Sequence, residues 1–245
     1  MRSARPEFLV IFMFALSVSP GPPAPYLTAE AAEDTAPNTL TAAEQAAGWK
    51  LLFDGRTTEG WRNFKKPSFP SQGWTVENGL LVKQSRIRGG DIVTTETYMD
   101  FELTWEWRIG PGGNNGVKYF ITEEHDGAIG HEYQMIDDSR VQDPKGTTAA
   151  FYAILPPSAN KQPPRINDWN QSRILVQGEH VEHWLNGVKV LEYELGSPMV
   201  LAAVAKSKFK DVPGFGSKLR GHILLTDHTD EAHFRNIKIR VLPVD

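Results

Sequence analysis

Short runs in which apolar and polar residues alternate dominate the chain from residue 49 onward. Residues 101–107 read Phe-Glu-Leu-Thr-Trp-Glu-Trp, so a strand there places its four apolar side chains on one face. Similar strand-like runs recur in eleven further segments, with turn residues between them. The predicted strands are 74–76, 80–83, 91–93, 101–109, 116–122, 131–136, 149–154, 171–177, 180–185, 188–193, 222–226 and 232–241.

Helical signals are sparse in the same pattern. Thr41-Ala-Ala-Glu44 is a capping-box sequence, and Gly48 is placed to end a helix of under two turns. No longer segment with a helical period is expected. Asn186-Gly187 between two apolar runs is the strongest hairpin signal, because both residues tolerate positive φ angles. Many short strands without a βαβ rhythm predict an all-β sandwich of two antiparallel sheets with a short N-terminal helix.

The first thirty-one residues have the pattern of an export signal. Arg2 and Arg5 precede an apolar run over 8–18, which is shorter than the roughly 20 residues that span a bilayer. We interpret 1–31 as a signal peptide, 32–47 as a linker with the short helix, and 48–243 as one domain. An earlier cut near Pro20 and an uncleaved anchor are the alternatives. The prediction is a periplasmic or secreted protein without a stable membrane span after cleavage.

Composition excludes several classes of function. The 245 residues carry 26 Lys plus Arg against 30 Asp plus Glu, a net charge of −4, which argues against a nucleic-acid partner. The absence of cysteine excludes disulfides, thiolate metal sites, cysteine catalysis and a lipid-anchored N-terminus.

Glu132 is the most informative polar residue. In 131–137 the alternation puts Glu132 and Gln134 on the face opposite Tyr133 and Met135, in the middle of an apolar strand. An unpaired carboxylate is costly to bury there. Glu132 is therefore either part of a structural ion pair or a general acid or base with a raised pKa.

Other candidate groups have weaker signals. His228, flanked by acidic residues, is either an oriented base or a turn cap, and Lys118 is a strand cation suited to an oxyanion. The glycine-rich 108–118 lacks the Gly-Lys-Ser/Thr of a phosphate loop, and the basic, aromatic 206–220 is interpreted as a site wall rather than a nucleic-acid patch. A metal near His125 or Asp230 is an alternative, but no short zinc motif is present, so no cofactor is predicted as required.

Several ordered strings resemble the 3-keto-disaccharide hydrolase family, also described as 3-keto-glucoside 1,2-lyase/3-keto-2-hydroxy-glucal hydratase. The matching segments are Gly48–Gly55, Gly60-Trp61, Gly112–Gly116, Glu132–Gln134, Val181–Val188, Ser207–Gly216, Asp227-His228 and Phe234–Ile239. The chain departs from the family pattern at Asn115, where Ser is common, at Thr226, where Gln is common, and at His131, where Pro is common.

The resemblance implies a concanavalin A-like jelly roll and an unusual sugar chemistry. A separate glycoside 3-oxidoreductase supplies a glucoside or disaccharide oxidised at its 3-hydroxyl. The ketone acidifies the proton on carbon 2, elimination then expels the glycosidic oxygen, and water adds to the enone. We assign Glu132 and His228 as base and acid, in either order, and Lys118 as the oxyanion stabiliser. The predicted substrate contacts are Gln134, Tyr152, Trp107, Asn115 and Lys208.

Two other classes remain open. A non-catalytic, lectin-like carbohydrate-binding module has the same predicted fold and would bind unoxidised glycans without turnover. An ordinary glycosidase needs two paired carboxylates, and Glu132 lacks a matching partner on a predicted strand.

Overall fold

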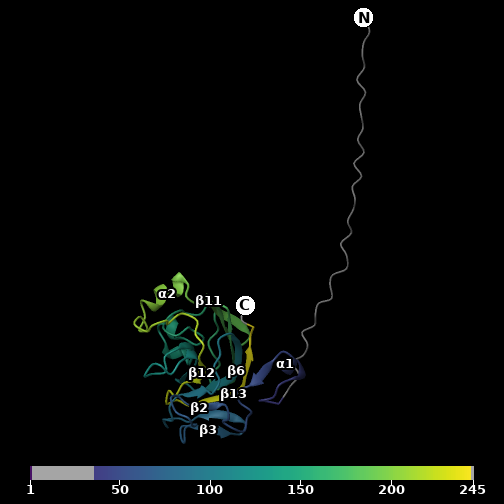
Figure 1. The fold of residues 1–245 in the computed structure, drawn as a ribbon, viewed down its shortest axis with the longest axis vertical. Coiled ribbons are helices and arrows are strands. Elements are labelled where there is room, and N and C mark those ends of the chain that lie inside the picture. The colour runs from purple at the N-terminus through teal and green to yellow at the C-terminus, as the bar shows by residue number, and fades with distance from the viewer. Residues whose placement is uncertain (2–35, 244–245) are drawn as a thin grey trace. The chain divides into compact units, whose positions relative to one another are not determined.

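The computed structural model describes Met1 and residues 36–243, and strands dominate residues 36–243 (Figure 1). Apart from Met1, the predicted signal peptide lies outside the described residues. Within the described part, no helix is long and apolar enough to cross a membrane. The strands form two antiparallel sheets, which confirms the predicted all-β sandwich.

The larger sheet has eight strands and includes the central strand that the alternation predicted most clearly. Its order is β11 (Val188–Glu194), β10 (His180–Leu185), β9 (Asn170–Gln177), β6 (Phe101–Ile109), β13 (Ala232–Val241), β4 (Leu80–Lys83) and β3 (Trp74–Glu77), with β1 (Trp49–Leu51) also paired to β13. Phe101, Leu103, Trp105 and Trp107 of β6 are all buried, as their shared face requires.

The smaller sheet has five strands in the order β2 (Trp61–Asn63), β5 (Ile92–Thr94), β12 (His222–Leu225), β7 (Asn114–Ile121) and β8 (His131–Ile136). One face of this sheet packs on the larger sheet. The ring of Tyr133 from β8, for example, meets the edge of Trp105 from β6 with 4.9 Å between the centroids. The residues of opposite parity on β7 and β8 point away from the core, and they carry the candidate chemistry.

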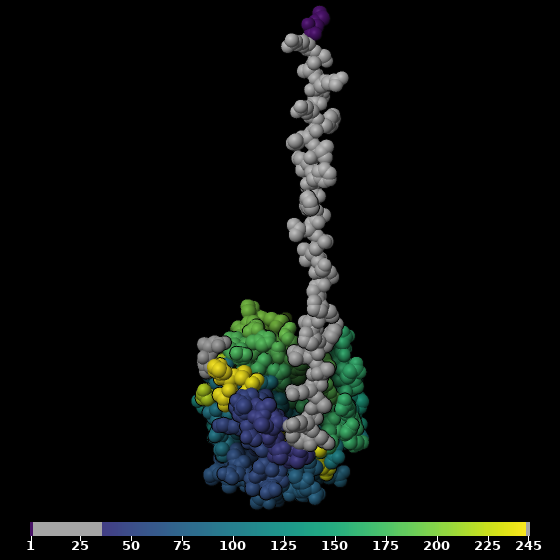
Figure 2. Space-filling model, turned by 90° about the vertical axis from the view of Figure 1, so that its right-hand side faces the viewer, coloured from purple at the N-terminus to yellow at the C-terminus, as the bar shows by residue number. Residues whose placement is uncertain are grey.

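The start of the domain is fastened to its end. The amide of Asn38 donates to the side chain of Asn236 in β13, and the amide of Asn236 donates back to the side chain of Asn38. β1 pairs with the same strand. Figure 2 shows the segment after residue 36, in purple, beside the C-terminal strand, in yellow.

Both helices are short, and one was not expected. The predicted capping box is present in α1 (Ala42–Ala46), where Thr41 and Glu44 exchange hydrogen bonds. The expectation that no longer helix follows is wrong, because α2 (Pro198–Val204) has seven residues. Ser197 caps α2 and Pro198 occupies its first turn, which is a favourable start for a helix. The two 3-10 turns are Asp138–Arg140 and Pro144–Gly146.

Most predicted strands are present, with small shifts at their ends, and the Asn186-Gly187 hairpin joins β10 to β11 with both residues at positive φ. The strand predicted over 149–154 is wrong. This segment makes only isolated bridges through Phe151, and Ala149 and Ala153 have positive φ angles, which break an extended strand. The short strands β1 and β2, with three residues each, were not predicted.

Candidate active site

The outer face of the five-stranded sheet carries a row of paired residues. Lys118 of β7 lies opposite Glu132 of β8 and, on its other side, opposite Leu224 of β12. Directly opposed residues of an antiparallel pair have Cβ atoms roughly 4.5–5.5 Å apart. The ammonium of Lys118 donates to the carbonyl of Ala128 at 3.1 Å, which holds it over this face.

Glu132 is a buried carboxyl group at the end of this row. Its side chain is 6% exposed, and no described residue donates a hydrogen bond to its carboxylate. Burial raises its pKa above the usual value, while the positive charges of Lys118 and Lys208 act against this shift and Asp91 adds to it. The result is a carboxyl group that keeps its proton to higher pH than a surface glutamate does.

Gly116 makes room for this carboxyl group. It lies beside Glu132 on the neighbouring strand, and a Cβ atom at Gly116 would be 2.3 Å from Oε1 of Glu132. Since real Cβ atoms do not approach so closely, any side chain at this position displaces the carboxylate.

His228 and Asp91 approach from the loops at the end of the same sheet. His228 follows β12 and is exposed; partial burial and the charge of Lys118 lower its pKa, against the charges of Asp91, Asp230 and Asp227. Asp91 precedes β5 and has the parity of Val93, which pairs with Leu224 in the row described above.

Two further groups come from the connecting segments. The amide of Tyr152 donates to the carbonyl of Glu132 at 3.0 Å, and the ammonium of Lys208 lies 4.4 Å from the centre of the Tyr152 ring. Lys208 belongs to the loop that follows α2. The loop is attached to the core by Phe215 and by the amide of Gly216, which donates to Nε2 of His131 at 3.0 Å.

The side chain of Gln134 is placed to accept a hydrogen bond from a bound molecule. It has the parity of Glu132, pairs with Gly116 and is 4% exposed. Its Oε1 atom is buried, and no donor among residues 36–243 reaches it. Buried acceptors are nearly always paired, so a hydroxyl group or a water molecule is the natural partner here.

Comparison with known proteins identifies the family. Residues 48–240 match the family of the 3-keto-alpha-glucoside-1,2-lyase-like domain. The chain belongs to this family. A 3-keto-disaccharide hydrolase of Bacteroides thetaiotaomicron is 30% identical over 240 residues, which cover 84% of this chain and 82% of that protein. These matches confirm the resemblance seen in the sequence motifs and place the chain among carbohydrate hydrolases.

Solved structures agree with this assignment. A protein from Parabacteroides distasonis assigned as a glycosyl hydrolase superposes with a TM-score of 0.77 at 33% identity, covering 85% of this chain and all of that one (100%). A second glycosyl hydrolase assignment from the same organism gives a TM-score of 0.61 at 28% identity, covering 79% of this chain and 99% of that one.

Two of the residues predicted as sugar contacts lie in the core rather than on the outer face. Trp107 is fully buried between the sheets, where its Nε1 atom donates to the hydroxyl of Ser172. Asn115 is also fully buried, and its amide donates to the carbonyl of Thr226. Strand parity predicts the inward direction of Trp107, which it shares with Phe101, so the pattern itself was the signal against this assignment.

The departures from the family pattern are compensated inside the protein. Asn115 and Thr226 bond to each other, because the Thr226 hydroxyl also donates to the Asn115 side chain at 3.4 Å. His131 is buried and accepts the hydrogen bond from Gly216. Asn115 and His131 therefore lie behind the outer face, and Thr226 is buried beside Asn115.

The structure brings Lys118, Glu132, Gln134, Tyr152 and Lys208 together on one side of the five-stranded sheet, with His228 at its edge. Asp91 is the member that the sequence analysis missed. Asp91 is the first residue of the predicted strand 91–93. Its side chain therefore shares a face with that of Val93, which is the sequence signal that could have indicated its place in the site.

His131 and Glu132, which follow His125 in the sequence, do not form a shared metal site. His131 and Glu132 are neighbours on a strand, so their side chains point to opposite faces and cannot bind one ion. On the far sheet, among the described residues, ligand atoms of His180, Glu182 and Glu192 lie within 4.8 Å of one another. Lys189 already pairs with both glutamates, which makes this cluster an ion-pair network.

Proposed function

We propose that this protein cleaves 3-keto-glucosides or 3-keto-disaccharides by β-elimination and then hydrates the product, with net hydrolysis of the glycosidic bond. Membership of the family supports the substrate class. The observation that carries the mechanism is the pairing of Lys118 with the buried, high-pKa carboxyl group of Glu132. This pair offers a cation for a developing oxyanion beside a group that holds a transferable proton.

The first step removes a proton from carbon 2. We assign this proton transfer to His228, because a lowered pKa favours the neutral imidazole, which is the form that can accept a proton. The electron pair of the C–H bond forms an enolate with the oxygen on carbon 3. The ammonium of Lys118 stabilises the negative charge on this oxygen. Without a nearby positive charge, the enolate would be costly to form.

The second step breaks the glycosidic bond. The enolate re-forms the ketone, a double bond forms between carbons 1 and 2, and the oxygen on carbon 1 leaves. Glu132 donates its proton to that oxygen, a role suited to a carboxylic acid with a raised pKa. Water then adds to carbon 1 while carbon 2 regains a proton, so the products are a free 3-keto sugar and the released alcohol.

Substrate contacts follow from the same face. The unpaired Oε1 of Gln134 accepts a hydrogen bond from a sugar hydroxyl, and the Lys208–Tyr152 pair forms the adjacent wall. We also propose that the protein is exported and that its substrate comes from a separate glycoside 3-oxidoreductase.

The decisive experiment compares a 3-keto-glucoside with its unoxidised parent. Purified protein is incubated with each sugar, and enone absorbance and released alcohol are followed. Turnover of the keto sugar alone supports the proposal. Equal turnover of both sugars would contradict a keto-dependent mechanism, and binding of the parent glycan without any turnover would favour a lectin-like module.

Leaving-group dependence separates the acid from the base. A nitrophenolate needs little help from an acid, so Glu132→Gln should retain far more activity on a 3-keto nitrophenyl glucoside than on a 3-keto disaccharide. His228→Ala should lose both activities together with the exchange of the carbon-2 proton into D₂O. The opposite pattern would reverse the two assignments.

A further inference from the structure

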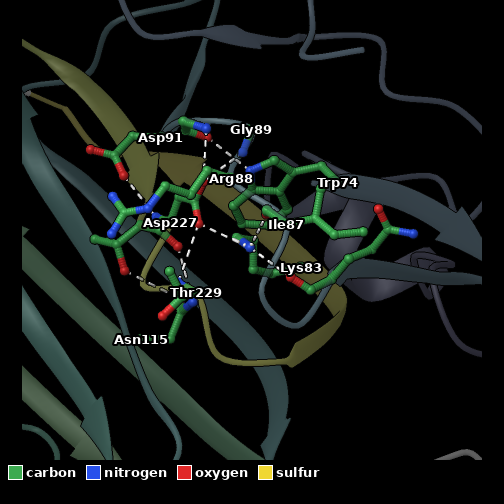
Figure 3. A network of polar contacts seen from close by, with 12 residues as sticks. Trp74, Lys83, Ile87, Arg88, Gly89, Asp91, Asn115, Asp227 and Thr229 are labelled. Carbon is green, nitrogen blue, oxygen red and sulfur yellow. Dashed lines mark hydrogen bonds and ion pairs between the residues drawn. The ribbon is translucent and has the colours of Figure 1, made fainter. Parts of the chain in front are cut away.

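A buried ion pair lies next to the loops that carry Asp91 and His228. Lys83, at the end of β4, is 0% exposed, and its ammonium lies 2.9 Å from Oδ1 of Asp227 (Figure 3). The same ammonium donates to the carbonyls of Gln84 and Ile87 at 2.7 and 2.8 Å. All three of its protons are therefore used, and the charge is fully compensated.

Asp227 gathers several backbone groups around its carboxylate. Its Oδ2 accepts from the amides of Gly89 and Gly90, both at 2.7 Å, and its Oδ1 accepts from the amide of Thr229. Burial opposes ionisation of Asp227, but Lys83 and these amides outweigh it, so the pKa of Asp227 is lowered. The carboxylate thus stays ionised to lower pH than a surface aspartate does, and it ties the loop over 84–90 to the loop after β12.

This junction reaches the site through two short connections. The amide of Asp227 donates to Oδ1 of Asp91 at 2.7 Å, which leaves the other oxygen of Asp91 free of this bond. His228 is the next residue along the chain. Lys83 belongs to the larger sheet and Asp227 follows a strand of the smaller one, so the pair fixes the site loops against the opposite sheet.

Stability alone is a weak reason for such a pair. Burying two charges removes them from water, and well-packed apolar residues of similar size often serve equally well or better. A buried ion pair does, however, define one geometry, because its hydrogen bonds are directional. Positions near a reacting bond depend strongly on such definition, since an error of about 1 Å can cost on the order of 100-fold in rate.

We propose that Lys83 and Asp227 are positioning residues that hold Asp91 and His228 in their working orientation against Lys118 and Glu132. This inference rests on the proposed function for the roles of His228 and Glu132. It adds Asp91 as a further ionisable group of the site. It also gives the buried pair an indirect role in the chemical step, through the residues that it positions.

Two double variants separate geometry from charge. Lys83→Met with Asp227→Asn removes both charges but keeps an oxygen that can accept from Gly89 and Gly90. Lys83→Met with Asp227→Ala removes the same charges and that acceptor as well. Removing both partners avoids leaving one buried charge unpaired. Any difference between these two variants therefore reports position.

The matched control is the pair of Lys238 and Glu44, which joins β13 to α1 on the larger sheet. Lys238→Met with Glu44→Gln removes an ion pair of the same types without touching the site, and Gln still completes the capping box. Far-UV circular dichroism and a cooperative thermal melt establish that each variant is folded at the assay temperature.

The expected result is graded. With a 3-keto-glucoside, kcat falls about 10-fold for the Asn variant and about 100-fold for the Ala variant, while KM changes less than about threefold. The control pair retains the kcat of the original protein. If both site variants keep that kcat, or if KM alone changes, the positioning role is wrong.

Histidine NMR gives a second measurement that does not depend on turnover. The His228 ring signal is assigned as the one lost in His228→Gln, and its pKa is measured in both double variants. The charges that act on this ring come from Lys118, Asp91, Asp230 and Asp227. A displaced loop gives the two variants different His228 pKa values, whereas equal values would refute the inference. If the protein is folded but turns over no keto sugar, the proposed function is wrong. The NMR comparison then still tests whether Lys83 and Asp227 position His228.

Discussion

Lys118 and Glu132 face each other across neighbouring strands on the outer side of the five-stranded sheet. The ammonium has a hydrogen-bond partner in the Ala128 carbonyl, whereas the carboxyl group is nearly buried and has a raised pKa. An ordinary ion pair would lower the pKa of the acid. Here burial outweighs the cations, so the pair combines a positive charge with a carboxyl group that keeps its proton to higher pH than a surface glutamate does.

This arrangement predicts that Glu132 raises the activity of the protein and lowers its free energy of unfolding. Glu132→Gln should lower kcat on a 3-keto disaccharide by 100-fold or more, since a general acid or base typically contributes about 10²–10⁴-fold. The same change should raise the free energy of unfolding at pH 7.5, because it removes a charge that burial disfavours.

The sign of the pH dependence provides the check on this prediction. A carboxyl group with a raised native pKa binds more protons folded than unfolded, so its contribution to stability falls as pH rises from the unfolded value through the native one. Urea unfolding at pH 4 and pH 7.5 should therefore show a gain for Glu132→Gln only at the higher pH. A loss of stability at pH 7.5 would contradict the interpretation.

Gly116 should be required for the position of the carboxyl group. Gly116→Ala places a methyl group where Oε1 of Glu132 now lies, so we expect kcat to fall on the order of 10- to 100-fold. Gly127→Ala is a matched control, since nothing lies within 4 Å of a Cβ atom there. Steady-state kinetics of both variants, with melts to verify folding, test this; unchanged kcat in Gly116→Ala would show that Glu132 can move without consequence.

Lys208, in the loop after α2, should affect the pKa of Glu132. Its charge lowers the pKa of Glu132, so Lys208→Met should raise that pKa further and move the alkaline limb of the kcat profile to higher pH. KM should also rise, because the Lys208–Tyr152 contact is lost from the wall. Lys206→Met, in the same loop, is the control. A limb that moves to lower pH would mean that Glu132 does not act as the acid.

The sequence predicted the sandwich and most of its strands because long alternating segments are local signals. β6 shows this clearly: its faces follow directly from parity. The strands β1 and β2 and the helix α2 escaped prediction because their formation depends on tertiary pairing or on a cap followed by an apolar run. Ala149 and Ala153 illustrate the same limit, since no local pattern indicated their positive φ angles.

The site was predictable where one strand carried the information and not where separate loops meet. Strand parity selected Glu132 and Gln134 for the outer face. The same rule places Trp107 and Asn115 on the inner face. The role of Asp91 depends on the amide of Asp227, which lies 136 residues later in the chain. Such a contact follows from sheet order, and a single sequence does not specify that order.

Two buried histidines predict how the fold responds to acid. His183 contacts the Tyr119 hydroxyl and the Ala149 carbonyl in the core, and burial lowers its pKa to about 4. Burial lowers the pKa of His131 to about 3, and the charge of His183 adds to this effect. Both rings are therefore neutral in the folded protein throughout the ordinary pH range.

For these groups the unfolded chain binds more protons than the native one between pH 6.5 and pH 4, so stability falls as pH falls through this range. Each ring should contribute a slope of up to about 1.4 kcal/mol per pH unit. His183→Gln should be less stable at pH 7 but show a shallower decline on acidification, measured by urea unfolding at pH 7, 5.5 and 4.5.

His180 offers a control with the opposite sign. Hydrogen bonds to Glu194 and Glu182 raise its pKa against a desolvation cost, so its stabilising contribution is present at low pH and lost as pH rises. His180→Gln should therefore lose stability mainly at acidic pH. At the same pH, the stability of His183→Gln should differ least from that of the original protein. A decline that is equally steep in His183→Gln and the original protein would show that the core histidines do not drive the acid response.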